Sequence, residues 1–373
     1  MRPRRSRRPR RRRPSGSRPP EQAVTKQQVR PELWLLAFLA AVCAVYVLFE
    51  LREILFPLIL ALLISLGFRP MMRKLSARKV PVALSILLVL LIVVGSSVLL
   101  STIVVNGVEE MVAAAPAYEE KLDRLLGKAA ESVRDATKEV GLEGYEFRWQ
   151  DTIEVSSLMR FGASSVGGVV SLTGNIFLAL LYLVFLLLGT NAFPGKIQQA
   201  FRPDLSVRIN KVLESVDTHV RRYLVAKTII SLVTATLVTI ILLAFGVDFA
   251  LFLGLVTFFL NFIPNIGSFI ATAFPGLVAL IQFESFGQAL LIILLLVVVQ
   301  SVMGNFIEPK LMGERLDLSP LAILLALIFW GWLWGIWGML LAVPITSLIK
   351  IICESIEPLK PFGVLLGSGR VKT

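Results

Sequence analysis

Apolar residues occur along this chain in runs that are long enough to cross a membrane, and polar segments separate these runs. A transmembrane helix needs about 20 consecutive apolar residues. The runs that we assign as membrane spans are Leu33–Phe49, Ile54–Phe68, Val82–Val108, Val169–Leu188, Thr228–Phe245 and Ala289–Phe306. The pattern predicts an all-α, polytopic integral membrane protein, with three spans in residues 33–108 and a fourth in residues 166–190.

Two further apolar runs are broken at their centres by turn residues. Ala250–Phe283 contains the segment 261–267, and Leu318–Ile352 contains the segment 330–338. Each run is about 35 residues long, which is too long for one span and short for two. Irregular backbone at membrane depth is tolerated only where it is buried in protein or lines a cavity. We therefore expect two helical hairpins, which bring the total to about eight transmembrane segments.

The order of elements in residues 228–352 is span, hairpin, span, hairpin. If the spans alternate in direction, the first hairpin enters the membrane from outside and the second enters it from inside. Such an inverted pair is typical of secondary transporters, whose substrate sites lie near the midplane at broken helices. We therefore predict that residues 228–352 form a transport core.

The composition agrees with a membrane protein. The chain is 55% hydrophobic and 17% charged, whereas soluble domains hold about 25% charged residues. Residues 1–32 contain eleven Arg and one Lys against two Glu, and so carry most of the net charge of +12. We expect this tail to be disordered and to hold the N-terminus in the cytoplasm, where it can touch anionic lipid. Arginine-rich tails also bind nucleic acid, but we expect no nucleic-acid partner here.

The polar segments indicate an orientation. The loop 69–79 and the segment 195–227 are basic like the tail, and so are expected in the cytoplasm together with the C-terminal tail 353–373. Residues 109–160 hold twelve acidic and seven basic residues, which indicates the other face. We expect a small extracytoplasmic helical domain in 109–165 and a cytoplasmic amphipathic segment in 195–227, whose helix 206–227 would lie at the membrane surface.

The break of the first hairpin carries the residues Asn261, Pro264, Asn265 and Gly267. Pro264 interrupts the helix, and Asn265 can cap the half-helix that follows. The free N–H groups at such a helix start favour an anion or an electron-rich oxygen. The carbonyls before the break could instead hold a cation, or the turn could bind no ligand.

The span before the second hairpin ends in a polar stripe. Gln300, Gly304 and Glu308 are spaced four residues apart, and Asn305 belongs to the adjoining stripe. Polar stripes on membrane helices face protein or water. Glu308 is our candidate for a titrating carboxylate, and pairing with Lys310 or Arg315 at a helix end is the alternative.

Other candidates have ordinary explanations. Four tryptophans lie between positions 330 and 337. They would anchor the hairpin at the membrane interface, or form an apolar gate or a platform for a small organic solute. Lys227 could extend its ammonium group to the interface. Two cysteines and one histidine are too few for a disulfide framework or a multi-histidine metal site. We find no nucleotide-binding or catalytic motif, and so expect neither an enzyme nor a cofactor.

Residues 205–352 resemble the autoinducer-2 exporter family of bacterial membrane proteins. The resemblance rests on Tyr223-Leu-Val-Ala-Lys227, Phe262-Ile-Pro-Asn-Ile-Gly267, Asn305-Phe-Ile-Glu-Pro309 and Gly338-Met-Leu-Leu-Ala-Val-Pro344. It implies an eight-segment protein of the bacterial inner membrane, a homo-oligomer and secondary transport. It also marks Tyr223, Lys227, Pro309, Gly338 and Pro344 as motif residues. Some members are assigned export of autoinducer-2, and others resemble sodium(lithium)/proton antiporters.

Three hypotheses follow. In the first, the protein exports a small polar organic solute, which Asn261, Asn265, Gln300 and Asn305 contact while Glu308 couples protons. In the second, the same geometry serves a cation/proton antiporter whose hairpin carbonyls hold the cation. In the third, the protein is a membrane scaffold without transport activity, and its segment 109–160 binds a partner.

Overall fold

The computed structural model describes residues 31–139, 176–189, 193–283, 285–312 and 318–368. The regular elements in these ranges are α1 (Pro31–Glu50), α2 (Arg52–Ala77), α3 (Val82–Glu139), a helix at Ile176–Gly189, α5 (Phe193–Ala200), α6 (Pro203–Ala244), α7 (Ala250–Leu260), α8 (Ile266–Gln282), α9 (Phe286–Ser301), the π-helix η2 (Val302–Ile307), α10 (Glu308–Met312), α11 (Pro320–Ser355), the 3₁₀-helix η3 (Glu357–Leu359) and α12 (Lys360–Leu366). An isolated antiparallel bridge joins Leu318 to Gly367.

The described residues are thus almost entirely helical, as the sequence predicted. Five of their helices are long and apolar enough to cross a membrane. The expected number of eight segments and their inverted arrangement stay predictions. The basic tail of residues 1–30 and the first part of the expected span Val169–Leu188, residues 169–175, lie outside the described residues.

The chain divides into two compact units, residues 1–47 and 48–373. In the first unit, the described side chains of α1 are mostly exposed, including Leu36 and Phe38. A helix of this composition is suited to a lipid environment. The functional residues considered below all belong to the second unit.

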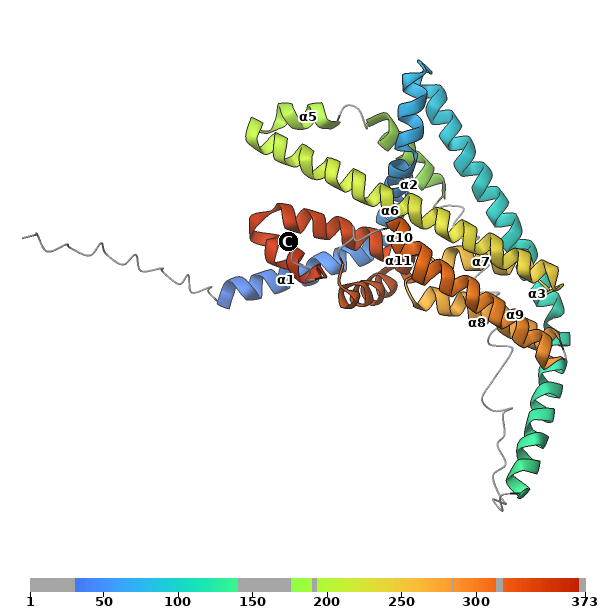
Figure 1. The fold of residues 1–373 in the computed structure, drawn as a ribbon. Coiled ribbons are helices and arrows are strands. Elements are labelled where there is room, and N and C mark those ends of the chain that lie inside the picture. The colour runs from blue at the N-terminus through green and yellow to red at the C-terminus, as the bar shows by residue number, and fades with distance from the viewer. Residues whose placement is uncertain (1–30, 140–175, 190–192, 284, 313–317, 369–373) are drawn as a thin grey trace, which may run out of the picture. The chain divides into compact units, whose positions relative to one another are not determined.

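Helix α6 lies at the centre of the second unit, where it packs against α2, α7, α9 and α11 (Figure 1). Its second half contributes Val238 and Leu242 to a core that also contains Leu253 of α7 and Ile292 of α9. Small residues permit close packing here, because a Cβ atom at Gly254 would collide with the hydroxyl group of Thr239.

Three helices are longer than the sequence pattern indicated. The basic residues of 69–79 lie mostly on the end of α2, which continues to Ala77, rather than in a loop. Residues 109–139 continue the same helix α3 that contains the third span. Residues 140–165 of the expected extracytoplasmic domain lie outside the described residues, so that domain stays a prediction. The segment 206–227 is helical, as expected, and it runs directly into the fifth span within α6. Its position at the membrane surface stays a prediction. Polar composition alone does not end a helix when the residues are good helix formers.

The first hairpin consists of α7, a turn at Asn261–Asn265, and α8, as expected from Pro264. The two helices pack against each other. Gly267 permits the close approach at the turn, because a Cβ atom there would lie 1.7 Å from the carbonyl oxygen of Leu260.

The second hairpin is contained in α11, whose backbone leaves helical geometry at Trp334 and Gly335. The indole Nε1 of Trp330 donates a hydrogen bond of 3.3 Å to Oγ1 of Thr346. Two residues separated by 16 positions in a straight helix would be about 24 Å apart, so the chain reverses its direction between them. A Cβ atom at Gly338 would lie 1.9 Å from the carbonyl oxygen of Trp330, which repeats the arrangement at the first turn.

The tryptophans of this hairpin differ in their exposure. Trp330 and Trp334 are buried and belong to a core cluster with Phe56 of α2. Trp332 remains largely exposed, at 63%. Trp330 and Trp334 are therefore part of the protein core, and an interfacial anchor formed by the tryptophans stays a prediction.

Candidate functional site

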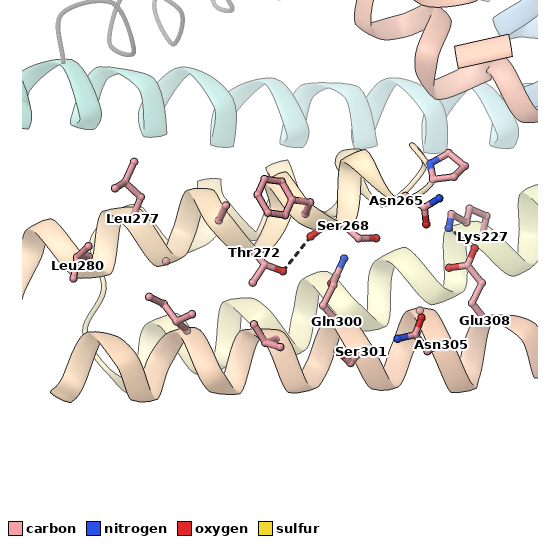
Figure 2. Close-up of a pocket in the computed structure, with 17 residues that line it drawn as sticks. Lys227, Asn265, Ser268, Thr272, Leu277, Leu280, Gln300, Ser301, Asn305 and Glu308 are labelled. Carbon is pink, nitrogen blue, oxygen red and sulfur yellow. Dashed lines mark hydrogen bonds and ion pairs between the residues drawn. The ribbon is translucent and has the colours of Figure 1, made fainter. Parts of the chain in front are cut away.

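A cleft of about 720 Å³ runs between α8 and the continuous stretch of α9 and η2 (Figure 2). Helix α6 contributes one residue to it, Lys227. The lining residues are Lys227, Pro264, Asn265, Ser268, Phe269, Thr272, Ala273, Gly276, Leu277, Leu280, Ile293, Val297, Gln300, Ser301, Gly304, Asn305 and Glu308. The structure thus brings together the turn of the first hairpin and the polar stripe that precedes the second hairpin.

An ion pair closes one end of the cleft. Lys227 Nζ lies 2.5 Å from Oε1 of Glu308, and the two side chains are 5% and 28% exposed. Lys227 is therefore buried with a partner, and the expectation that it extends to the interface is wrong. Glu308 pairs with Lys227 rather than with Lys310, while Arg315 lies outside the described residues. A carboxylate has a second oxygen, which can serve a ligand in the cleft.

Lys227 and Glu308 are the only formally charged residues among those described as lining the cleft. They neutralise one another at contact distance, so the site as a whole carries no net charge. Membrane segments tolerate ionisable residues where these pair and face the protein interior. The pair thus makes a polar, electrically balanced end to the cleft.

Asn261 has a different position from the one the sequence suggested. It is buried, 6% exposed, and it is absent from the cleft lining. Its Oδ1 accepts a hydrogen bond of 2.6 Å from Nε2 of Gln300, which does line the cleft. Asn261 therefore holds Gln300 in place. Of these two side chains, Gln300 is the one that can reach a ligand in the cleft.

Asn265 lies at the tip of the first hairpin with φ 60° and ψ −58°. It occupies the N-cap position of α8, but its side chain makes no capping hydrogen bond, so the predicted capping role is wrong. Its side chain lines the cleft instead. Positive φ is uncommon for residues other than Gly, with Asn among the more tolerant types. Gly267 itself does not line the cleft and acts through the close packing of the turn.

The π-helix η2 changes the geometry of the polar stripe. Pro309 has no N–H group and so cannot donate to the carbonyl oxygen of Asn305, which would be its partner in an α-helix. Wider π turns occur often at functional sites. Gln300, Ser301, Asn305 and Glu308, which come from both adjoining stripes and from both sides of η2, all line the cleft.

The remaining motif residues surround the site without lining the cleft. Tyr223 is buried one turn before Lys227 and packs with Leu318 and Val343. Pro344 and Gly338 are buried in α11. Tyr223 thus packs α6 against Val343 of α11, and Gly338 permits the close approach of the two halves of α11.

Sequence reasoning missed Lys227 as a site residue, together with Ser268 and Thr272. The available signal was charge. A lysine at the start of one span and a glutamate at the end of another are costly in a membrane unless they pair. The described residues include no group of three metal-ligating side chains, so this part of the chain offers no built metal centre.

Comparison with known proteins identifies a family of membrane transporters. The profile of the family described as "AI-2E family transporter" matches residues 35–357. The AI-2 transport protein TqsA of Escherichia coli (strain K12) is 34% identical over 316 residues, which cover 84% of this chain and 89% of that protein. The putative transport protein YhhT of the same strain is 30% identical over 325 residues, which cover 86% of this chain and 90% of YhhT. The putative transport protein YueF of Bacillus subtilis (strain 168) is 29% identical over 79% and 82%.

Proposed function

The chain belongs to the AI-2E transporter family, and we propose that it is a secondary transporter that exports a small polar organic solute through the cleft. Family membership supports a role in membrane transport. We propose in addition which kind of solute is transported and that a secondary mechanism drives its transport. TqsA is named an AI-2 transport protein, so an AI-2-like signal is the first solute to test.

The observation that carries the proposal is the neutral polar end of the cleft. The Lys227–Glu308 pair and the side chains of Asn265, Gln300 and Asn305 offer hydrogen-bond donors and acceptors without a net charge. Such a lining suits an uncharged polar solute better than a free ion, because an ion would lose its hydration shell without gaining a counter-charge.

In this proposal the two hairpins act together. The reversals at Asn261–Asn265 and at Trp334–Gly335 give two broken helices in one core, as in inverted-repeat transporters. We propose that the two hairpins enter from opposite faces and that Glu308 couples protons to solute movement. The inner membrane of a bacterium, cytoplasmic termini and a homo-oligomeric assembly belong to the same proposal.

A sodium(lithium)/proton antiporter is the second candidate. Glu308 favours it, because it is a partly exposed carboxylate in the cleft and lies beside the polar turn at Asn265. For a cation to bind there, Lys227 would first have to release Glu308. That requirement places the antiporter second.

Purified protein in proteoliposomes separates the two candidates. An internal pH dye would report proton movement after addition of sodium or lithium, and a labelled AI-2-like solute would report solute flux in parallel vesicles. The proposal predicts solute flux that Glu308→Gln uncouples from an imposed pH gradient. Cation-dependent proton flux without solute flux would instead establish the antiporter.

A further inference from the structure

The cleft has two chemically different halves. One half contains the ion pair together with Asn265, Gln300 and Asn305, whereas the other is lined by the apolar residues Ala273, Leu277, Leu280, Ile293 and Val297. In Figure 2, Leu277 and Leu280 lie at one end and Lys227, Asn265, Asn305 and Glu308 lie at the other. Ser268 and Thr272 lie between the two ends.

The cleft is longer than a small polar solute requires. Asn265 and Leu280 both line it, and the α-helical rise places them about 22 Å apart along α8. Its volume of about 720 Å³ falls within the range of pockets that hold drug-sized ligands. A solute the size of a small sugar would occupy the polar half and leave the apolar half to another group.

The apolar half is a formed surface between two packed helices. Helices α8 and α9 pack against each other, and a Cβ atom at Gly276 would lie 3.0 Å from Cγ1 of Ile293. The helices are therefore in contact beneath the cleft, while Ala273 and Leu277 remain exposed above it. Exposed apolar residues along a cleft of this length provide a binding surface for a hydrocarbon chain.

We propose that the cleft binds an amphiphile, with an uncharged hydrogen-bonding head at the Lys227–Glu308 end and a hydrocarbon chain that extends toward Leu280. The inference rests on the transport site proposed above and changes its ligand from a small polar solute to a polar head that carries a hydrocarbon chain. The neutral ion pair selects the uncharged head, and the apolar half accommodates the chain.

A series of 1-O-alkylglycerols tests the inference, because every member has the same neutral diol head. Binding of labelled members, from ethyl to decyl, would be measured to the full chain in lipid nanodiscs. The proposal predicts that affinity rises about fourfold for each added methylene, the gain expected for burying a methylene, until the chain reaches the end of the cleft. Affinity that does not depend on chain length would overturn it.

Alkylglycerols with longer chains also partition more strongly into the nanodisc lipid, so a matched pair of variants is needed to identify binding in the cleft. Ala273→Trp fills the apolar half, and it should reduce binding of the long-chain members to that of the short-chain ones. Ile270→Trp places the same bulk on an exposed position of α8 that does not line the cleft, and it should leave the series unchanged. Equal effects of the two substitutions would also overturn the proposal.

Two sources of such an amphiphile can be separated. Dioleoylglycerol added to the nanodisc lipid should displace labelled alkylglycerol if the natural ligand is a membrane lipid, and should not if it is a soluble amphiphile that fits only one chain. The transport proposal is independent of this result. If binding depends on chain length but no solute flux is seen, the transport proposal is refuted and the amphiphile site is kept. If solute flux is seen but binding does not depend on chain length, the amphiphile site is refuted and the transport proposal is kept.

Discussion

Gln300 donates a hydrogen bond of 2.6 Å to Asn261, across 39 positions of the sequence, and so joins α9 to the turn of the first hairpin. The bond uses the amide nitrogen of Gln300 and leaves its carbonyl oxygen for the cleft. A solute that bonds to Gln300 is therefore in contact with a side chain whose position the hairpin determines. Movement of the turn and occupation of the cleft become linked through this one amide.

Substitution of Asn261 by alanine should weaken solute binding without removing a cleft-lining residue. The lost hydrogen bond contributes about 1 kcal/mol, so we expect the apparent KM to rise about fivefold while the maximal rate falls little. The measurement is solute flux in proteoliposomes over a range of solute concentrations.

Thr257→Ala is the matched control for Asn261→Ala. Thr257 is also buried on α7, but its hydroxyl group bonds to the carbonyl oxygen of Leu253 in its own helix. It should leave the KM unchanged. If both substitutions raise the KM equally, Asn261 stabilises the fold and does not position Gln300.

Lys227 and Glu308 should show strong coupling in a double-mutant cycle. Lys227→Met leaves a partly buried carboxylate without its partner, which we expect to cost up to about 3 kcal/mol of unfolding free energy. Addition of Glu308→Gln to that variant should recover part of the loss. Denaturation of the purified variants measures each term.

The exposed pair of Arg124 and Glu120 provides the comparison for that cycle. Its side chains are 55% and 73% exposed, so solvent screening should reduce its coupling to a few tenths of a kcal/mol. Equal coupling in the two cycles would show that Lys227 and Glu308 are solvated in the membrane-bound protein.

The two turns should be intolerant of a single added methyl group. Alanine at Gly267 or Gly338 would place a Cβ atom within 2 Å of a carbonyl oxygen of the opposing helix, and relief of the overlap should cost about 1–3 kcal/mol. Thermal unfolding measures the loss. Gly287→Ala, where the added atom meets nothing within 4 Å, should not destabilise the protein, and a similar loss there would contradict the close packing of the turns.

Hydrogen bonds connect α3 to the two ends of the first hairpin, at Asp248 before α7 and at Gln282 at the end of α8. The hydroxyl group of Tyr118 donates a 2.9 Å hydrogen bond to Oδ2 of Asp248, while Gln282 accepts from the backbone N–H of Asp248 and donates to the carbonyl oxygen of Gly246. Tyr118→Phe should therefore raise hydrogen–deuterium exchange at residues 246–249 and 282, because a bond to a charged acceptor contributes about 1.5–3 kcal/mol. Tyr182→Phe, in a separate core cluster, should leave this region unchanged. Unchanged exchange in both variants would show that this hydrogen bond does not hold the hairpin.

Local sequence signals located the turns well. Pro264 and the glycines around Trp334 mark the reversals, because proline removes a helix donor and glycine accepts the close approach of another backbone. The polar stripe that contains Gln300 and Glu308 was also visible, because polar side chains at regular spacing in an apolar segment are rare.

Long-range contacts were not visible in the sequence. The partner of Glu308 is 81 positions away, and the side chain that holds Gln300 was itself expected to contact the solute. The burial of Trp334 depends on Phe56 of α2, which no local pattern near the tryptophans indicates. The π-helix at Val302–Ile307 was likewise not predicted from the sequence.

Solute flux through a protein labelled inside the cleft tests the central claim most directly. Asn305→Cys would be introduced into a chain in which Cys43 and Cys353 are serine, and a bulky maleimide would then be attached. The account predicts that labelling abolishes flux and that excess solute slows the labelling. Phe306→Cys, on an exposed neighbouring residue that does not line the cleft, should remain active when labelled to the same extent by mass spectrometry. Full flux through the protein labelled at position 305 would contradict the account.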